Sequence, residues 1–136
     1  MSVMLRDVMT KNVLTTAPDA TVADAARAMT ERKIGSACVV DEQGRLLGII
    51  TERDVLRAAG SGRDLVNESV TAWMTPDPVT IGPDEMPCSE IANIMMERGF
   101  RHLPILAGDD LIGIVSMRDV WRFSFLPSEP DDVLRA

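Results

Sequence analysis

The sequence contains one pattern twice. Residues 48–55, GIITERDV, return 65 residues later as residues 113–120, GIVSMRDV, with the apolar, hydroxyl, Arg and Asp positions in register. The repetition extends upstream, because Met9-Thr10 matches Met74-Thr75. A unit of this length in only two copies predicts a pseudo-symmetric pair rather than a solenoid. A chain of this kind should offer two related binding sites.

Length and charge limit which kinds of protein and ligand are compatible with the sequence. The chain has 136 residues, 46% of them hydrophobic, which predicts a folded protein. A unit of about 60 residues buries a limited part of its surface, so we expect the two halves to complete a shared core. The formal net charge of −7 argues against nucleic acid as a partner. A small phosphate-bearing ligand remains compatible with it, because a few arginines can cluster locally.

Compartment and redox chemistry follow from what the sequence lacks. No apolar run reaches the roughly 18 residues that cross a bilayer, and the first residues lack the layout of a signal peptide, so we expect a cytoplasmic protein without a membrane partner. Cys38 and Cys88 have neither CxxC nor metal-ligand spacing. We expect both to be free thiols; the alternative is that they form a redox-active pair. The spacing also predicts no metal site.

Hydrophobic periodicity predicts the same order of elements in both copies, a helix, two strands and a second helix. A polar turn between the two strands favours a hairpin, and either Asp19 or Thr21 is a plausible cap for the first helix. In the first copy the predicted elements are a helix over 21–32, strands over 37–40 and 46–50, and a helix over 52–59; in the second they are a helix over 89–98, strands over 103–106 and 111–116, and a helix over 117–123.

The repeats predict the domain organisation. We expect the first repeat over residues 1–60, a linker over 61–69 and the second repeat over 70–125. Residues 126–136, rich in Asp, Glu and Pro, are predicted to form a flexible acidic tail.

The repeated motif places polar groups where a strand meets a helix. Thr51 and Ser116 stand at a strand end, beside the free N–H groups and the positive dipole end of the following helix, a place that favours anions. Asp54 and Asp119 follow three residues later on nearly the same helical face. A carboxylate there can accept hydrogen bonds from both hydroxyls of a ribose.

Arg53 and Arg118 add a positive charge next to each of these Asp residues, within reach of a phosphate. The same spacing has a purely structural interpretation. A hydroxyl followed three residues later by a carboxylate is also an ordinary capping box, in which the carboxylate serves the start of the helix rather than a ligand. The residues alone leave both interpretations open.

At this point the sequence resembles the cystathionine β-synthase (CBS) domain family, and in particular its tandem pair, the Bateman module. The resemblance rests on the openings Asp7-Val8-Met9-Thr10 and Ala72-Trp73-Met74-Thr75, on the order of elements and on the Gly-apolar-apolar-Thr/Ser-x-Arg-Asp motif in each copy, and it covers about residues 3–124. It implies an α+β fold of two pseudo-symmetric β-α-β-β-α repeats packed through their small sheets.

The resemblance also implies roles for particular residues. In CBS pairs the Asp of the motif often holds the ribose of an adenosyl ligand, and the hydroxyl contacts the ligand or its phosphate. Arg101 and His102 match basic residues that hold phosphate in nucleotide-sensing members of the family, whereas the first copy has Gly35 and Ser36 there. The crossed geometry usual in such pairs implies that Arg101 and His102 face the pocket of Asp54, and Gly35 and Ser36 that of Asp119.

Two further positions resemble the wall that faces the adenine in this family. They are Thr16, in the segment Thr15-Thr16, and Ile81, in the segment Thr80-Ile81. The alternative is that both belong to ordinary edge strands. For His102, the alternative is a partly buried, hydrogen-bonded histidine at the sheet edge.

The function that follows is a stand-alone CBS-pair regulatory protein. It would bind AMP, ADP, ATP or S-adenosylmethionine as a regulatory ligand, with no other cofactor, and signal occupancy to an effector protein; a homodimer is expected. The alternative is a ligand-free dimerisation or interaction module with vestigial pockets. A single His and the absence of nucleophile-elbow and Walker motifs argue against an enzyme.

Overall fold

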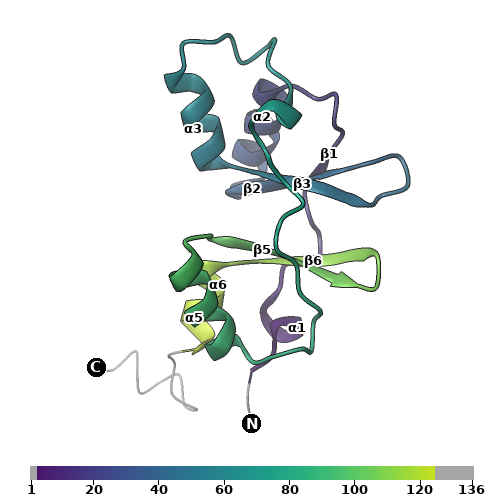
Figure 1. Ribbon diagram of the computed structural model, residues 1–136, viewed down its shortest axis with the longest axis vertical. Coiled ribbons are helices and arrows are strands. Elements are labelled where there is room, and N and C mark those ends of the chain that lie inside the picture. The colour runs from purple at the N-terminus through teal and green to yellow at the C-terminus, as the bar shows by residue number, and fades with distance from the viewer. Residues whose placement is uncertain (1–2, 125–136) are drawn as a thin grey trace. The chain divides into compact units, whose positions relative to one another are not determined.

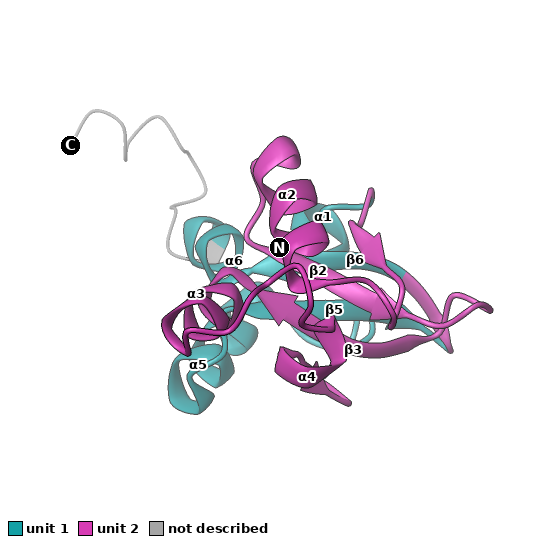
Figure 2. Cartoon of the chain, turned by 90° about the horizontal axis from the view of Figure 1, so that it is seen from above, with its two compact units in different colours: residues 1–11, 80–108, 112–136 teal, residues 12–79, 109–111 magenta. Residues whose placement is uncertain are grey.

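The computed structural model describes residues 3–124, and these form two compact units (Figure 2). Unit 1 takes the chain up to Lys11, Thr80–Gly108 and the chain from Ile112 onward. Unit 2 takes Asn12–Val79 and Asp109–Leu111. The units therefore cut across the two sequence repeats, whose boundaries stay a prediction.

Unit 2 contains a four-stranded sheet in the order β1-β2-β3-β4 (Figure 1). Its strands are β1 (Thr15–Thr16), β2 (Ser36–Val40), β3 (Leu46–Thr51) and β4 (Thr75–Pro76). β1 runs parallel to β2, and the other two pairs are antiparallel. The predicted hairpin turn is confirmed, and Asp41 closes it by accepting hydrogen bonds from the backbone N–H groups of Gln43 and Arg45, both at 2.9 Å.

Three helices complete unit 2: α2 (Val22–Arg32), α3 (Glu52–Gly60) and α4 (Val70–Trp73). Of the two caps considered for α2, the structure selects Thr21, whose Oγ1 accepts from the Asp24 N–H at 3.0 Å while the Asp24 carboxylate accepts from the Thr21 N–H at 3.3 Å. In Figure 1, α2 and α3 lie on the same face of the sheet. The core beneath them includes most of the predicted apolar positions, although Ala26 is only half-buried, and it consists of Val22, Ala25, Met29, Ala37, Val39, Ile50, Ala58 and Val70.

Unit 1 repeats this plan. Its strands, β5 (His102–Ala107) and the part of β6 (Asp110–Ser116) from Ile112 onward, pair with each other. Single bridges flank them, a parallel one between Ile81 and Ile105 and an antiparallel one between Thr10 and Ile114. Its helices are α1 (Leu5–Val8), α5 (Cys88–Arg98) and α6 (Met117–Ser124), and its core contains Leu5, Ile81, Cys88, Ile91, Ala92, Met95, Leu103, Ile105, Val115 and Val120.

The opening of each sequence repeat packs in the unit built mainly from the other repeat. Thr10 exchanges two backbone hydrogen bonds with Ile114, of 2.8 and 3.0 Å, and Thr75 pairs with Ile49 in the equivalent register. The preceding methionines cover the glycines of the repeated motif: a Cβ on Gly113 would lie 2.5 Å from the Sδ of Met9, and one on Gly48 would collide with Met74. The repeated motif therefore requires glycine at this position, because the opening segment packs too closely against it to leave room for a Cβ.

Candidate functional site

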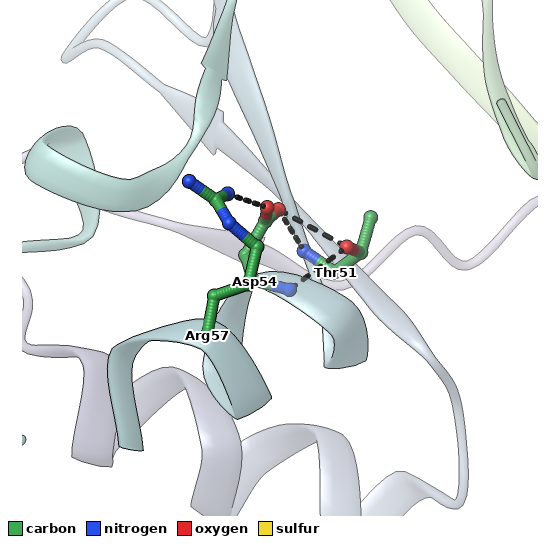
Figure 3. Close-up of polar contacts among 3 residues, drawn as sticks. All are labelled: Thr51, Asp54 and Arg57. Carbon is green, nitrogen blue, oxygen red and sulfur yellow. Dashed lines mark hydrogen bonds and ion pairs between the residues drawn. The ribbon is translucent and has the colours of Figure 1, made fainter. Parts of the chain in front are cut away.

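The first corner lies where β3 ends and α3 begins (Figure 3). The Oδ2 atom of Asp54 accepts hydrogen bonds from the Thr51 N–H at 2.9 Å and from the Thr51 hydroxyl at 3.0 Å. The Thr51 hydroxyl accepts in turn from the Asp54 N–H at 3.4 Å. The capping box considered from the sequence is thus present, and it holds the Asp54 carboxylate at the first turn of the helix.

A residue that the sequence analysis did not select completes this corner. The Nη1 atom of Arg57 lies 3.0 Å from the Oδ1 atom of Asp54 and forms an ion pair with it. The Asp54 side chain is 10% exposed, whereas that of Arg57 is 59% exposed. The i, i+3 spacing of the two residues on a predicted helix makes this pair possible but does not by itself select it.

The second corner lies where β6 ends and α6 begins. The Ser116 hydroxyl donates to the Oδ2 atom of Asp119 at 2.9 Å, and the Asp119 N–H donates to the Ser116 hydroxyl at 3.1 Å. Arg122 occupies the position equivalent to Arg57, but its guanidinium lies over the Phe123 ring, 5.7 Å from the centroid. Within residues 3–124, Asp119 forms no ion pair. The two corners thus share the bonds between hydroxyl and Asp, but within the described residues only the first adds a bond from the backbone N–H of the capping residue and a charged partner.

Arg53 and Arg118, predicted to offer charge to a phosphate, are both exposed in the first turns of α3 and α6. Neither takes part in an ion pair within the described part of the chain. Their placement beside the corners matches the sequence prediction, and contact with a ligand stays a prediction.

Gly35 and Arg101 occupy equivalent places, just before β2 and β5 respectively. The Gly35 carbonyl accepts from the Glu52 N–H at 3.0 Å, and the Arg101 carbonyl accepts from the Met117 N–H at 2.7 Å. Each therefore binds the first turn of the helix in its own unit. The Arg101 side chain is exposed.

Ser36 and His102 follow as the first residues of β2 and β5. Ser36 is buried and pairs in register with Thr51, so the structure brings it to the first corner. His102 is half-buried at the start of its strand. The predicted crossing, in which each of these positions serves the Asp of the other repeat, stays a prediction.

Thr16 and Ile81, predicted to face an adenine, lie at sheet edges. Thr16 is half-buried in β1 and pairs with Val39. The Ile81 N–H donates to the Pro104 carbonyl at 3.3 Å, its own carbonyl accepts from the Leu106 N–H at 2.9 Å, and its side chain belongs to the core of unit 1. The edge-strand interpretation describes both positions, and for Ile81 it already uses both backbone groups. A role of either residue in ligand binding stays a prediction.

Both cysteines are free, as predicted, and both are buried. Burial raises the pKa of the Cys38 thiol to about 12 and also raises the pKa of Cys88. The part of the chain that the structure covers holds no cluster of His, Cys, Asp and Glu suited to a metal ion. No helix between residues 3 and 124 is long and apolar enough to cross a bilayer.

The repeated corners, the strand order and the order of helices define a fold of two related units, and comparison with known proteins gives its family. The chain belongs to the CBS domain family, which matches it over residues 5–61 and 68–120. It is therefore a CBS-domain pair, as the motifs predicted.

Relatives and solved structures agree with this membership. An uncharacterised 17.7 kDa protein of Acidianus ambivalens is 41% identical over 123 residues, 90% of this chain and 73% of that protein. The chain spans only 40% and 61% of the length of two further curated relatives.

Two solved structures share the fold. The CBS domain pair of the protein MJ0100, in complex with 5′-methylthioadenosine and S-adenosyl-L-methionine, has a TM-score of 0.81 at 25% identity and covers 90% of this chain and 95% of that one. A hexameric CBS-CP12 protein from bloom-forming cyanobacteria has a TM-score of 0.86 at 28% identity and covers 100% and 84%.

Proposed function

We propose that this CBS-domain pair is a regulatory module that binds an adenosyl ligand, such as AMP, ADP, ATP or S-adenosylmethionine, and passes its occupancy to a partner protein. The observation that carries the proposal is the repeated corner, in which a hydroxyl and a carboxylate converge at the N-terminus of a helix in each unit. The complex of the MJ0100 pair with two adenosyl compounds supports this ligand class.

The chemistry of each corner suits the parts of such a ligand. A carboxylate accepts hydrogen bonds from vicinal ribose hydroxyls, which are both donors. The free N–H groups and dipole at the start of α3 and of α6 favour a negative group nearby. Arg53 and Arg118, both exposed beside their corners, add a charge for a phosphate. Arg101 and His102 add two further basic residues in the second repeat, at the positions where the first repeat has Gly35 and Ser36.

Signalling would be a linkage effect rather than a catalytic step. A ligand favours the arrangement of the pair that it binds more tightly, and it shifts the equilibrium only by that difference in affinity. A partner protein that prefers the same arrangement would then bind more tightly in the presence of the ligand. Thermodynamic reciprocity requires that the partner also tightens ligand binding by the same factor.

A ligand-free interaction module is the second candidate, and a specific observation favours it. Helix capping alone accounts for the hydroxyls and carboxylates, through a full capping box at Thr51 and Asp54 and through the reciprocal hydroxyl bonds of Ser116 and Asp119. Large apolar side chains are also exposed on helices, among them Leu56, Met96 and Trp121. The CBS-CP12 neighbour, which shares this fold, is a hexamer. In that case the corners would only cap their helices and bind no ligand, and the function would be assembly with further copies of the chain.

Calorimetric titration of AMP, ADP, ATP and S-adenosylmethionine into the purified chain separates the two. We expect Asp54→Ala and Asp119→Ala each to weaken binding at its own corner by about tenfold or more, because a hydrogen bond to a charged group contributes about 1.5–3 kcal/mol.

Asp24→Ala is the matched control, because Asp24 makes the same capping box with Thr21, but at the start of α2, which belongs to neither corner. It should bind as the wild type does. Binding that persists unchanged in the Asp54→Ala/Asp119→Ala double variant, or no binding of any of the four compounds to the wild type, would overturn the proposal.

A further inference from the structure

Arg57 joins the first corner to the segment that connects the two repeats. Its Nη1 atom pairs with Asp54 at 3.0 Å, and its guanidinium carbon lies 5.6 Å from the centroid of the Trp73 ring. Trp73 belongs to α4, and its Nε1–H donates to Glu68 at 3.1 Å. Glu68 lies 3.9 Å from the Nε atom of Arg63. One line of polar and aromatic contacts therefore runs from the Asp54 carboxylate into residues 63–73.

The pairing with Arg57 limits what Asp54 can offer to a ribose. A carboxylate has about four lone-pair positions. At Asp54, three are used, two on Oδ2 by Thr51 and one on Oδ1 by Arg57. A ribose diol brings two donors, so it meets one remaining position on a side chain that is only 10% exposed. Full engagement of the diol therefore requires Arg57 to leave.

The second corner has no such competitor. Asp119 accepts from the Ser116 hydroxyl, and the equivalent arginine, Arg122, is turned to the Phe123 ring. Within the described residues, most of the lone-pair positions of Asp119 are open to a diol. The same residue type at the same position thus blocks one carboxylate and spares the other, which gives a matched comparison within one chain.

We propose that Arg57 determines the affinity of the Asp54 corner by competing with the ribose for the carboxylate, and that its displacement by a ligand is transmitted to Trp73. The inference rests on the proposed function and adds its regulation. Loss of the ion pair frees the guanidinium from one of its two partners, so the cation over the indole ring moves and the environment of Trp73 changes. The Asp119 corner fills first, and the Asp54 corner carries the signal to residues 63–73.

Adenosine is the probe, because it has the diol and no phosphate that Arg57 might bind. The background is Asp119→Ala, so that only the Asp54 corner is measured. Arg57→Met keeps the apolar stem and removes the charge. We expect it to raise the affinity for adenosine about two- to fivefold, the size of a largely exposed ion pair. The increase in affinity caused by Arg57→Met should be smaller for 2′-deoxyadenosine, which lacks one of the two hydroxyl donors.

The matched control is Arg122→Met in an Asp54→Ala background, which should leave the affinity for adenosine at the Asp119 corner unchanged. Tryptophan emission gives a second readout. In Asp119→Ala/Trp121→Phe, adenosine should change the emission of Trp73, and adding Arg57→Met should abolish most of that change.

The outcomes separate this inference from the function on which it rests. Adenosine binding that is unchanged or weakened by Arg57→Met overturns the competition and leaves the proposed function standing. A Trp73 emission change that persists in Arg57→Met overturns the transmission. No binding of adenosine or S-adenosylmethionine to the wild type or to any variant overturns both the inference and the proposed function.

Discussion

Replacing Gly48 with Ala tests the close approach between the opening segment and the repeated motif. A Cβ at this position would lie 2.8 Å from the Thr75 carbonyl oxygen and would also collide with the Met74 side chain. Met74 can change rotamer, but the Thr75 backbone is held by its pairing with Ile49 in β3. Relief of the contact therefore requires β4 to move away from β3.

Overpacking of this kind costs about 1–3 kcal/mol, and the fixed backbone contact places Gly48→Ala toward the upper end, at about 2–3 kcal/mol. Gly113→Ala is the matched comparison. There, each of the three nearest atoms belongs to the Met9 side chain, at 2.5, 2.9 and 3.2 Å. A flexible side chain yields more easily than a backbone carbonyl, so we expect a smaller loss of about 1–2 kcal/mol.

Urea unfolding followed by circular dichroism measures both values. With a slope of about 1–3 kcal/mol/M, the midpoint for Gly48→Ala should fall by roughly 1–2 M while the slope stays constant. An unchanged midpoint for Gly48→Ala, or a larger loss for Gly113→Ala than for Gly48→Ala, would refute the reasoning. A change in slope would instead mean that the variant alters the surface exposed on unfolding.

Two further predictions concern ionisable groups. The Arg6 guanidinium lies 2.9 Å from Asp84 and holds the pKa of that carboxyl below its usual range. The pair therefore stabilises the folded state above about pH 4. This contribution is lost as the pH falls through the lowered folded-state pKa. Thermal melts between pH 6 and pH 2 should therefore show a smaller acid-induced loss for Asp84→Asn than for the wild type, and parallel curves would contradict the assignment. Burial raises the pKa of Cys38 to about 12, so its thiol should stay protonated at pH 8. It should therefore not react with a thiol reagent until the protein is denatured. Rapid labelling of the folded chain would show that the site opens.

The local elements could be predicted because each has a short-range cause. The apolar spacing of Val22, Ala25, Ala26 and Met29 predicted α2, and Thr21, one of the two caps considered, is where the helix begins. The polar turn at Asp41 predicted the hairpin between β2 and β3. Family membership, confirmed by the match over both repeats, followed from the same motif that placed Asp54 and Asp119 at helix starts.

The remaining features depend on contacts between residues far apart in sequence. Nothing local to Met9 indicates that it covers Gly113, because the periodicity of each segment is the same whichever unit it joins. The four-residue helix α1 is too short to give a periodic signal. The choice of Arg57 to pair with Asp54, while Arg122 turns to Phe123, is a choice of rotamer that identical residue types in equivalent positions cannot reveal.

The exchanged openings change what a break in the chain would do. A nick between residues 61 and 69 divides the sequence into its two repeats, but each compact unit contains chain from both sides of the nick. The two fragments are therefore interleaved, and each holds a strand or bridge that the other's sheet requires. Neither fragment alone therefore contains all the chain of either compact unit.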